Sequence, residues 1–92
     1  MRIFVYGSLR RKQGNSHWMT NAQWLGDHCV EDYQLYSLGH YPGAVPGDGS
    51  VLGEVYRIDA ATLGELDALR TAGGEYKRQL IQTPYGSAWM YV

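Results

Sequence analysis

The chain has 92 residues, of which 45% are apolar, and it carries a net charge of −1 at pH 7. This length predicts one domain spanning residues 1–92, with no room for a separate cofactor domain. The slightly acidic balance argues against nucleic-acid and membrane-surface partners, and no apolar run approaches the roughly 20 residues of a membrane helix. The single cysteine, Cys29, excludes a disulfide framework and fits a reducing compartment, so we expect a cytoplasmic protein.

The N-terminal part of the sequence predicts a strand followed by a short helix. Residues 3–6 form a continuous apolar, β-favouring run that Gly7 interrupts, which is typical of a strand buried on both faces. Asn15 and Ser16 are both suitable N-caps for a helix that continues to about Trp24.

The middle of the sequence predicts two strands separated by a long loop. Residues 28–38 are strand-like but only weakly patterned, and residues 51–58 also have the composition of a strand. Between them, residues 39–49 are rich in glycine and contain two prolines. We predict a loop there, and long ordered loops in small domains are often functional.

The C-terminal third predicts one helix and a β-hairpin. Asp59 is a suitable N-cap for a helix over residues 60–70, in which leucines at positions 63, 66 and 69 form an apolar stripe. Residues 76–83 and 87–92 have strand character, and the Pro-Tyr-Gly sequence between them indicates a tight turn.

The sequence offers no motif for a metal ion, an activated nucleophile or a phosphate-binding loop. The three histidines and Cys29 lack the short spacings of metal ligands. Ser8 follows the first strand but lies outside a Gly-x-Ser-x-Gly motif, and no Gly-x-x-x-x-Gly-Lys loop is present. We therefore expect neither a metal nor a cofactor.

Tyr6, Gly7, Ser8 and Leu9 lie at the C-terminal end of the first predicted strand, where ligands of mixed α/β proteins often bind. Glycine allows a positive φ, and the amides after it can point at an anion. The alternative is an ordinary turn, because residues 85–87 repeat the Tyr-Gly-Ser tripeptide inside a predicted hairpin. The residues alone leave both interpretations open.

Two of the nine carboxylates remain as candidates for a general base. Glu54 shares a strand face with apolar residues, so we expect it to point inward and to need a partner, for which Arg57 and Arg78 are candidates. Glu75 follows two glycines at the start of a strand, where a turn can deliver a carboxylate to a sheet edge. An exposed turn charge is the alternative interpretation of Glu75.

An ordered set of short motifs runs along the chain. Tyr6-Gly7-Ser8-Leu9 is followed by Tyr33-Gln34-Leu35-Tyr36, Gly39-His40-Tyr41-Pro42-Gly43, Val51-x-Gly53-Glu54-Val55-Tyr56, Leu66-Asp67 and Tyr76-x-Arg78. No single motif is specific, but the order and spacing of the set resemble the gamma-glutamylcyclotransferase-like family over essentially the whole chain. The resemblance implies an α+β fold, in which helices pack outside a mixed, barrel-like β-sheet.

The resemblance also implies an enzyme that cleaves a γ-glutamyl amine or amide and releases 5-oxoproline and a free amine, a cyclising reaction of the transferase or lyase type. The α-amine of the substrate attacks its own γ-carbonyl. Tyr6, Gly7, Ser8 and Leu9 then hold the γ-glutamyl group through backbone amides, and a glutamate accepts the ammonium proton. The partner implied is thus a small γ-glutamyl substrate, and the reaction requires neither a metal nor a cofactor.

The sequence departs from this family at the position of the base. Family members commonly read Leu-Asp-x-x-Glu-Gly, whereas Arg70 here stands where that Glu is expected. Glu75 is the nearest carboxylate downstream and precedes the Tyr-x-Arg element, so we predict that Glu75 is the catalytic base. The alternative is a non-catalytic small-molecule-binding module of the same fold that has lost its base. Relatives also usually continue beyond Val92, and the lack of such a tail is expected to weaken stability or open the pocket.

The resemblance brings three tyrosines of separate segments together. Tyr6, Tyr41 and Tyr76 each adjoin a motif glycine or a carboxylate, and they predict a small pocket lined by tyrosines. The alternative is that these rings are core aromatics.

Overall fold

The computed structural model describes residues 1–7, 17–37, 42–71 and 76–92. The elements are β1 (Arg2–Val5), the 3-10 helix η2 (His17–Asn21), β2 (Gln23–Ser37), β3 (Pro42–Arg57), α1 (Ala60–Thr71), β4 (Arg78–Thr83) and β5 (Gly86–Tyr91). The strands form one sheet in the order β2-β3-β1-β5-β4, in which only the β1–β5 pair is parallel. This mixed sheet with one α-helix confirms the predicted α+β class.

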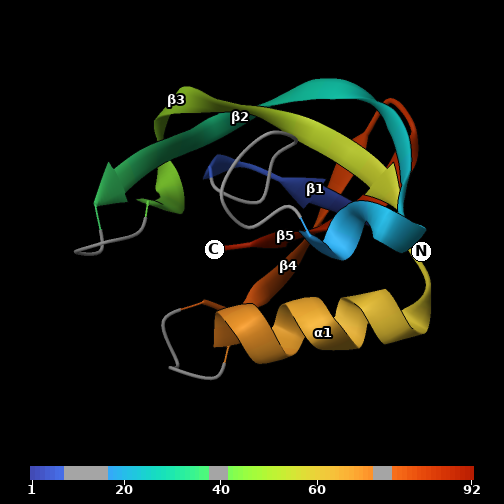
Figure 1. The fold of residues 1–92 in the computed structure, drawn as a ribbon. Coiled ribbons are helices and arrows are strands. Elements are labelled where there is room, and N and C mark those ends of the chain that lie inside the picture. The colour runs from blue at the N-terminus through green and yellow to red at the C-terminus, as the bar shows by residue number, and fades with distance from the viewer. Residues whose placement is uncertain (8–16, 38–41, 72–75) are drawn as a thin grey trace.

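Strand β1 lies at the centre of the sheet because its side chains are apolar on both faces. Ile3, Phe4 and Val5 are all at most 1% exposed. Ile3 and Val5 pack in one core cluster with residues of α1 and η2, whereas Phe4 packs in a second cluster with residues of β2 and β3. Figure 1 shows α1 along one face of the sheet and the long β2–β3 hairpin arching over the other. The predicted doubly buried first strand is therefore confirmed.

The segment from η2 to β3 differs from the sequence-based prediction in two places. The helix after residue 16 is only the 3-10 turn of His17–Asn21, and Trp24 already belongs to β2. Strand β3 begins at Pro42, so most of the loop predicted over residues 39–49 is strand; the rest of that range lies outside the described residues. The glycines there serve close packing, because a Cβ at Gly47 would lie 2.6 Å from the Gln34 side chain.

The β4–β5 turn reaches across to the opposite edge of the sheet. The β4–β5 hairpin is confirmed, with Thr83 paired to Gly86 across the turn. Tyr85 in that turn donates a hydrogen bond of 3.4 Å to the carbonyl of Asp27 in β2. Its hydroxyl occupies the space that a Cβ at Gly26 would fill, at a bulge in the β2–β3 ladder. This contact brings β2 and the β4–β5 turn together.

Helix α1 begins at the predicted cap. The Oδ1 atom of Asp59 accepts a hydrogen bond of 2.7 Å from the backbone N–H of Thr62. Bonds from the Thr62 side chain and backbone hold the pKa of the Asp59 carboxyl below its usual value. Leu63 and Leu66 are buried against the sheet, whereas Leu69 is half exposed, so the predicted stripe is confirmed only for the first two leucines.

Gly64 is an exposed glycine in the interior of α1, and a Cβ there would meet no atom within 4 Å. We expect Gly64→Ala to raise the free energy of unfolding by about 0.5–1 kcal/mol, because alanine loses less backbone entropy on folding. Urea denaturation at pH 7 measures the difference. Gly53→Ala is the control of opposite sign, since its Cβ would collide with the Val5 carbonyl and the Phe4 ring. A destabilised Gly64→Ala variant would contradict the open environment of this position.

Candidate functional site

Tyr6 and Gly7 follow β1 and begin the predicted substrate-binding loop. Tyr6 is buried, and its hydroxyl donates to the Tyr91 carbonyl at 2.6 Å and accepts from the Ala44 N–H at 3.1 Å. Gly7 has φ = +63°, a left-handed conformation that glycine adopts without strain. The Tyr6 side chain thus ties β1 to β3 and β5, and Gly7 has the positive φ that glycine allows at this position.

Removing the Tyr6 hydroxyl should cost stability. Tyr6→Phe leaves the buried N–H of Ala44 and the carbonyl of Tyr91 without this partner, so we expect the free energy of unfolding to fall by about 1–2 kcal/mol. Urea denaturation followed by circular dichroism measures the loss. Tyr85→Phe is the matched control, because its hydroxyl is exposed and makes a bond of only 3.4 Å. Equal effects of the two variants would argue against the anchoring role of Tyr6.

The other predicted site residues lie outside the part of the chain that the structure describes. Ser8, Leu9 and Glu75 lie outside the described residues, as does Tyr41. Tyr6 and Tyr76 are both buried, but they pack in different core clusters. Strand alternation directs the Tyr6 ring to the same face as Phe4, so the two rings pack in different parts of the core. The pocket predicted from these tyrosines and Tyr41 stays a prediction.

Glu54 is buried, as its strand face predicted, and lies opposite Val5 in the β1–β3 ladder. Its Oε1 atom accepts a hydrogen bond of 2.8 Å from the Tyr56 hydroxyl. Neither arginine considered for this role forms an ion pair with Glu54 among the described residues: Arg57 is exposed, and Arg78 pairs with another carboxylate. Because side chains alternate along β3, Arg57 points to the face opposite Glu54 and is excluded as its partner. Tyr56, two residues after Glu54, lies on the same face and is the partner observed.

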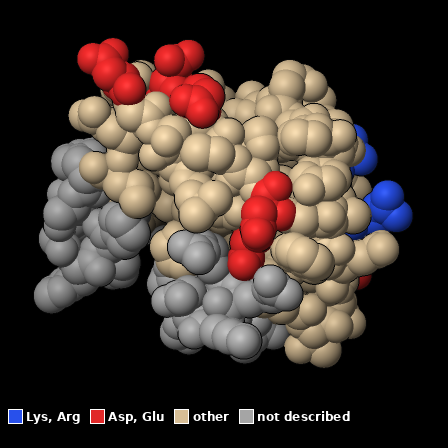
Figure 2. Space-filling model, turned by 90° about the horizontal axis from the view of Figure 1, so that it is seen from above, with Lys and Arg blue, Asp and Glu red and all other residues tan. Residues whose placement is uncertain are grey.

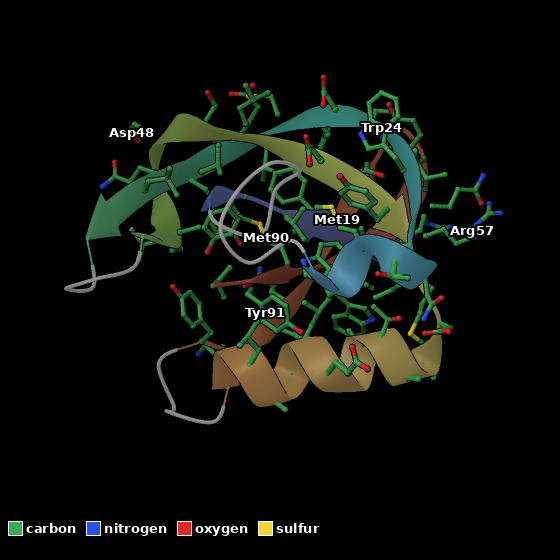
Figure 3. The ribbon with its side chains drawn as sticks, viewed as in Figure 1. Met19, Trp24, Asp48, Arg57, Met90 and Tyr91 are labelled. Carbon is green, nitrogen blue, oxygen red and sulfur yellow. The ribbon has the colours of Figure 1, made fainter. Side chains whose placement is uncertain are left out.

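A second polar group joins α1 to the end of the sheet. Asp67 accepts a hydrogen bond of 2.9 Å from the Tyr91 hydroxyl and pairs with Arg78 at 3.2 Å. The Arg78 guanidinium also lies 4.8 Å from the centre of a Trp89 ring. In Figure 3, Tyr91 points toward α1 and Met90 points to the other side of β5. The Leu-Asp and Tyr-x-Arg motifs therefore meet on the α1 face of the sheet, the face that also carries Glu54.

Burial distinguishes Glu54 from the other carboxylates of the β2–β3 hairpin. The exposed ones are Asp27, Glu31, Asp32 and Asp48. Figure 2 shows acidic side chains gathered on the upper face of the molecule, over this hairpin. Glu54, at 6% exposed, is therefore the buried carboxylate of the hairpin.

The described residues hold no group of three or more His, Cys, Asp or Glu side chains arranged for a metal ion. In the same part of the chain, no helix has both the length and the apolar character needed to cross a membrane.

The comparison with known proteins covers nearly the whole chain. A sequence model of the family described as gamma-glutamyl cyclotransferase, AIG2-like, matches residues 3–92. The chain belongs to this family. The gamma-glutamylcyclotransferase family protein YtfP of Escherichia coli K12 is 85% identical over 92 residues, which are 100% of this chain and 81% of the relative. The family expected from the ordered motifs is thereby confirmed, and it is one of enzymes of the cyclotransferase type.

Solved structures of the family share the fold. A protein from Pyrococcus horikoshii is 33% identical with a TM-score of 0.89, over 99% of this chain and 75% of that protein. An AIG2-like protein from Mus musculus is 30% identical with a TM-score of 0.85, again over 99% of this chain and 75% of that one. The strand order and the helix on one face are thus features of the cyclotransferase fold.

Proposed function

We propose that the chain cleaves a γ-glutamyl amine or amide and releases 5-oxoproline and the free amine. The observation that carries this proposal is the family match over residues 3–92, together with the buried β1 strand that leads into Tyr6 and Gly7. Gly7 adopts a left-handed conformation directly after β1, and in this proposal the backbone amides of the segment that it begins bind an oxygen of the substrate.

In the proposed reaction, the α-nitrogen of the substrate attacks its γ-carbonyl carbon. The new C–N bond closes a five-membered lactam, and the original amide C–N bond breaks. Two protons pass from the attacking nitrogen to the departing amine, and Glu75 carries them as general base and then general acid. The backbone amides of Gly7, Ser8 and Leu9 stabilise the oxyanion that develops on the carbonyl oxygen. The bound, folded substrate lowers the entropic cost of ring closure.

Two described contacts support a site shared by the Tyr6 loop and the segment of Glu75. Tyr76, which follows Glu75, packs in the same core cluster as Val5, which precedes Tyr6. Two residues further on, Arg78 is held by Asp67 of α1. Val5 and Tyr76, which adjoin the two candidate segments, are therefore packed together on the α1 face, whereas the Tyr6 ring packs on the other face.

A second candidate function is binding without turnover, and it is favoured by Arg70, which occupies the position where the family commonly has its glutamate. Such a module would retain the loop after β1 and hold a γ-glutamyl compound or 5-oxoproline unchanged. Binding to the folded state alone would raise the melting temperature.

The proposed partner is a small γ-glutamyl molecule, and the proposed compartment is the cytoplasm. Cys29 is an exposed free thiol. Such a group persists as a thiol in a reducing compartment.

The decisive experiment incubates the purified protein with a panel of γ-glutamyl amino acids and γ-glutamyl amines and measures 5-oxoproline by mass spectrometry. We expect time-dependent 5-oxoproline from at least one member of the panel. Raised melting temperatures without any product would instead support the binding module. Glu75→Gln protein serves as the background control for spontaneous cyclisation.

A further inference from the structure

Trp18 carries an unused hydrogen-bond donor inside the protein. The side chain is 4% exposed. Among the described residues, its indole Nε1 is the one buried side-chain nitrogen or oxygen that has no hydrogen-bond partner. A buried N–H without an acceptor is destabilising, and buried tryptophans usually bond this group. The donor is therefore available to an acceptor that the described residues do not supply.

Trp18 packs with two described residues that adjoin predicted site residues in sequence. Trp18 packs in the core cluster that contains Val5 and Tyr76, the described neighbours in sequence of Tyr6 and Glu75. Its ring meets that of Tyr56 edge-on, with the two centres 5.2 Å apart. The Tyr56 hydroxyl in turn bonds the buried Glu54. The Trp18 ring thus lies beside Tyr56, the residue that bonds the buried Glu54 on the α1 face.

We propose that the indole N–H of Trp18 donates a hydrogen bond to the γ-carbonyl oxygen of the bound substrate, which becomes the lactam oxygen of 5-oxoproline. This inference rests on the proposed function, because it takes the γ-glutamyl group as the ligand. The oxygen becomes more negative as the ring closes, so a donor inside the protein, where water is scarce, supports the reacting state more than the resting one.

A neutral carbonyl fits this place better than the α-carboxylate of the substrate. The carboxyl group of Glu54, at 6% exposed, already occupies the neighbourhood through its bond with Tyr56. Two carboxylates that share a poorly hydrated site repel each other. A carbonyl oxygen accepts the indole hydrogen bond without adding a second charge.

Nuclear magnetic resonance tests the proposal on the intact protein. The 15N-labelled chain has three indole N–H signals, one for each tryptophan, which single Trp→Phe variants assign. The probes are 5-oxoproline, 2-pyrrolidinone as a lactam without a carboxylate, and acetate as a carboxylate without a lactam. We expect the Trp18 indole proton to move downfield with both lactams and to stay in place with acetate. The Trp24 signal is the internal control, because that ring is 44% exposed on β2 (Figure 3).

A matched pair of variants gives a second readout. Trp18→Phe should weaken lactam binding about 10-fold, the equivalent of one lost hydrogen bond. Trp89→Phe shortens another tryptophan packed against the same cluster and should leave lactam affinity unchanged. Where Trp18→Phe lowers the melting temperature too far for titration, the sulfur analogue benzothienylalanine at position 18 keeps the ring shape and removes only the N–H.

The results that overturn the proposal differ from those that overturn the proposed function. A Trp18 signal that both lactams leave in place overturns the inference, even where 5-oxoproline is produced. So does a shift that follows acetate rather than 2-pyrrolidinone, or an upfield signal from an N–H directed at the Tyr56 ring that no probe changes. A Trp18 signal that moves with both lactams, in a protein that turns over no γ-glutamyl substrate, supports the inference and overturns the proposed catalytic function.

Discussion

Replacing Glu75 with glutamine is expected to lower turnover by about 10²- to 10⁴-fold, the contribution of a positioned general base. The ammonium of the substrate must lose a proton before its nitrogen can attack, and the amide of glutamine cannot accept that proton. We expect little change in melting temperature, because the change from carboxylate to amide keeps the size of the side chain. Single-turnover release of 5-oxoproline measures the first effect, and differential scanning calorimetry measures the second.

The matched control for Glu75→Gln is Glu65→Gln, which removes an exposed carboxylate from α1. Glu65→Gln should retain full turnover, since Glu65 lies on the solvent side of the helix. Full activity of Glu75→Gln would remove this residue from the mechanism. A drop in turnover that equals a drop in the folded fraction would assign Glu75 a structural role.

Local patterns in the sequence predicted the elements whose stability is local. Asp59 and Thr62 form the cap of α1 within four residues, and the β4–β5 turn closes between Thr83 and Gly86. The residues of β1 are apolar on both faces of the strand, so their own sequence indicates that the strand is buried. Such elements depend on neighbouring residues, so their patterns are visible without the fold.

The β2–β3 hairpin was mispredicted because its stability is not local. Glycine and proline favour turns in isolated sequence. In the fold, Gly47 lies against Gln34, and Pro46 is paired with Tyr33 in the ladder. A bulge between Glu31 and Tyr33 absorbs the irregularity. These partners lie more than ten residues apart in the chain, so a pattern read along one strand does not reveal them.

In the candidate site, too, local features were predictable from the sequence and long-range contacts were not. The position of Tyr6 and Gly7 at the end of β1 was predicted from the sequence. The use of the Tyr6 hydroxyl was not, because its partner Tyr91 is 85 residues away. The indole N–H of Trp18, which has no partner among the described residues, becomes visible only in the fold, because it depends on which acceptors surround the ring.

Glu54→Gln is expected to lower the free energy of unfolding by about 2–3 kcal/mol while turnover per folded molecule stays nearly intact. The Tyr56 hydroxyl bonds a buried carboxylate at 2.8 Å, and hydrogen bonds to charged groups are the stronger class. Glutamine retains one oxygen for this hydroxyl but adds a buried NH2 group that needs an acceptor. Urea denaturation measures the stability, and turnover is divided by the folded fraction.

Tyr56→Phe and the double variant show whether the bond itself carries this stability. If it does, the cost of Glu54→Gln in the Tyr56→Phe background differs from its cost in the original chain, because the two side chains no longer share a hydrogen bond. Equal costs would show that Glu54 stabilises the fold through other contacts.

The activity of the same variants decides which of the two carboxylates, Glu54 or Glu75, is the base. Should Glu54→Gln abolish turnover in a folded protein while Glu75→Gln retains it, Glu54 is the base, and its bond with Tyr56 is part of the proton-transfer machinery.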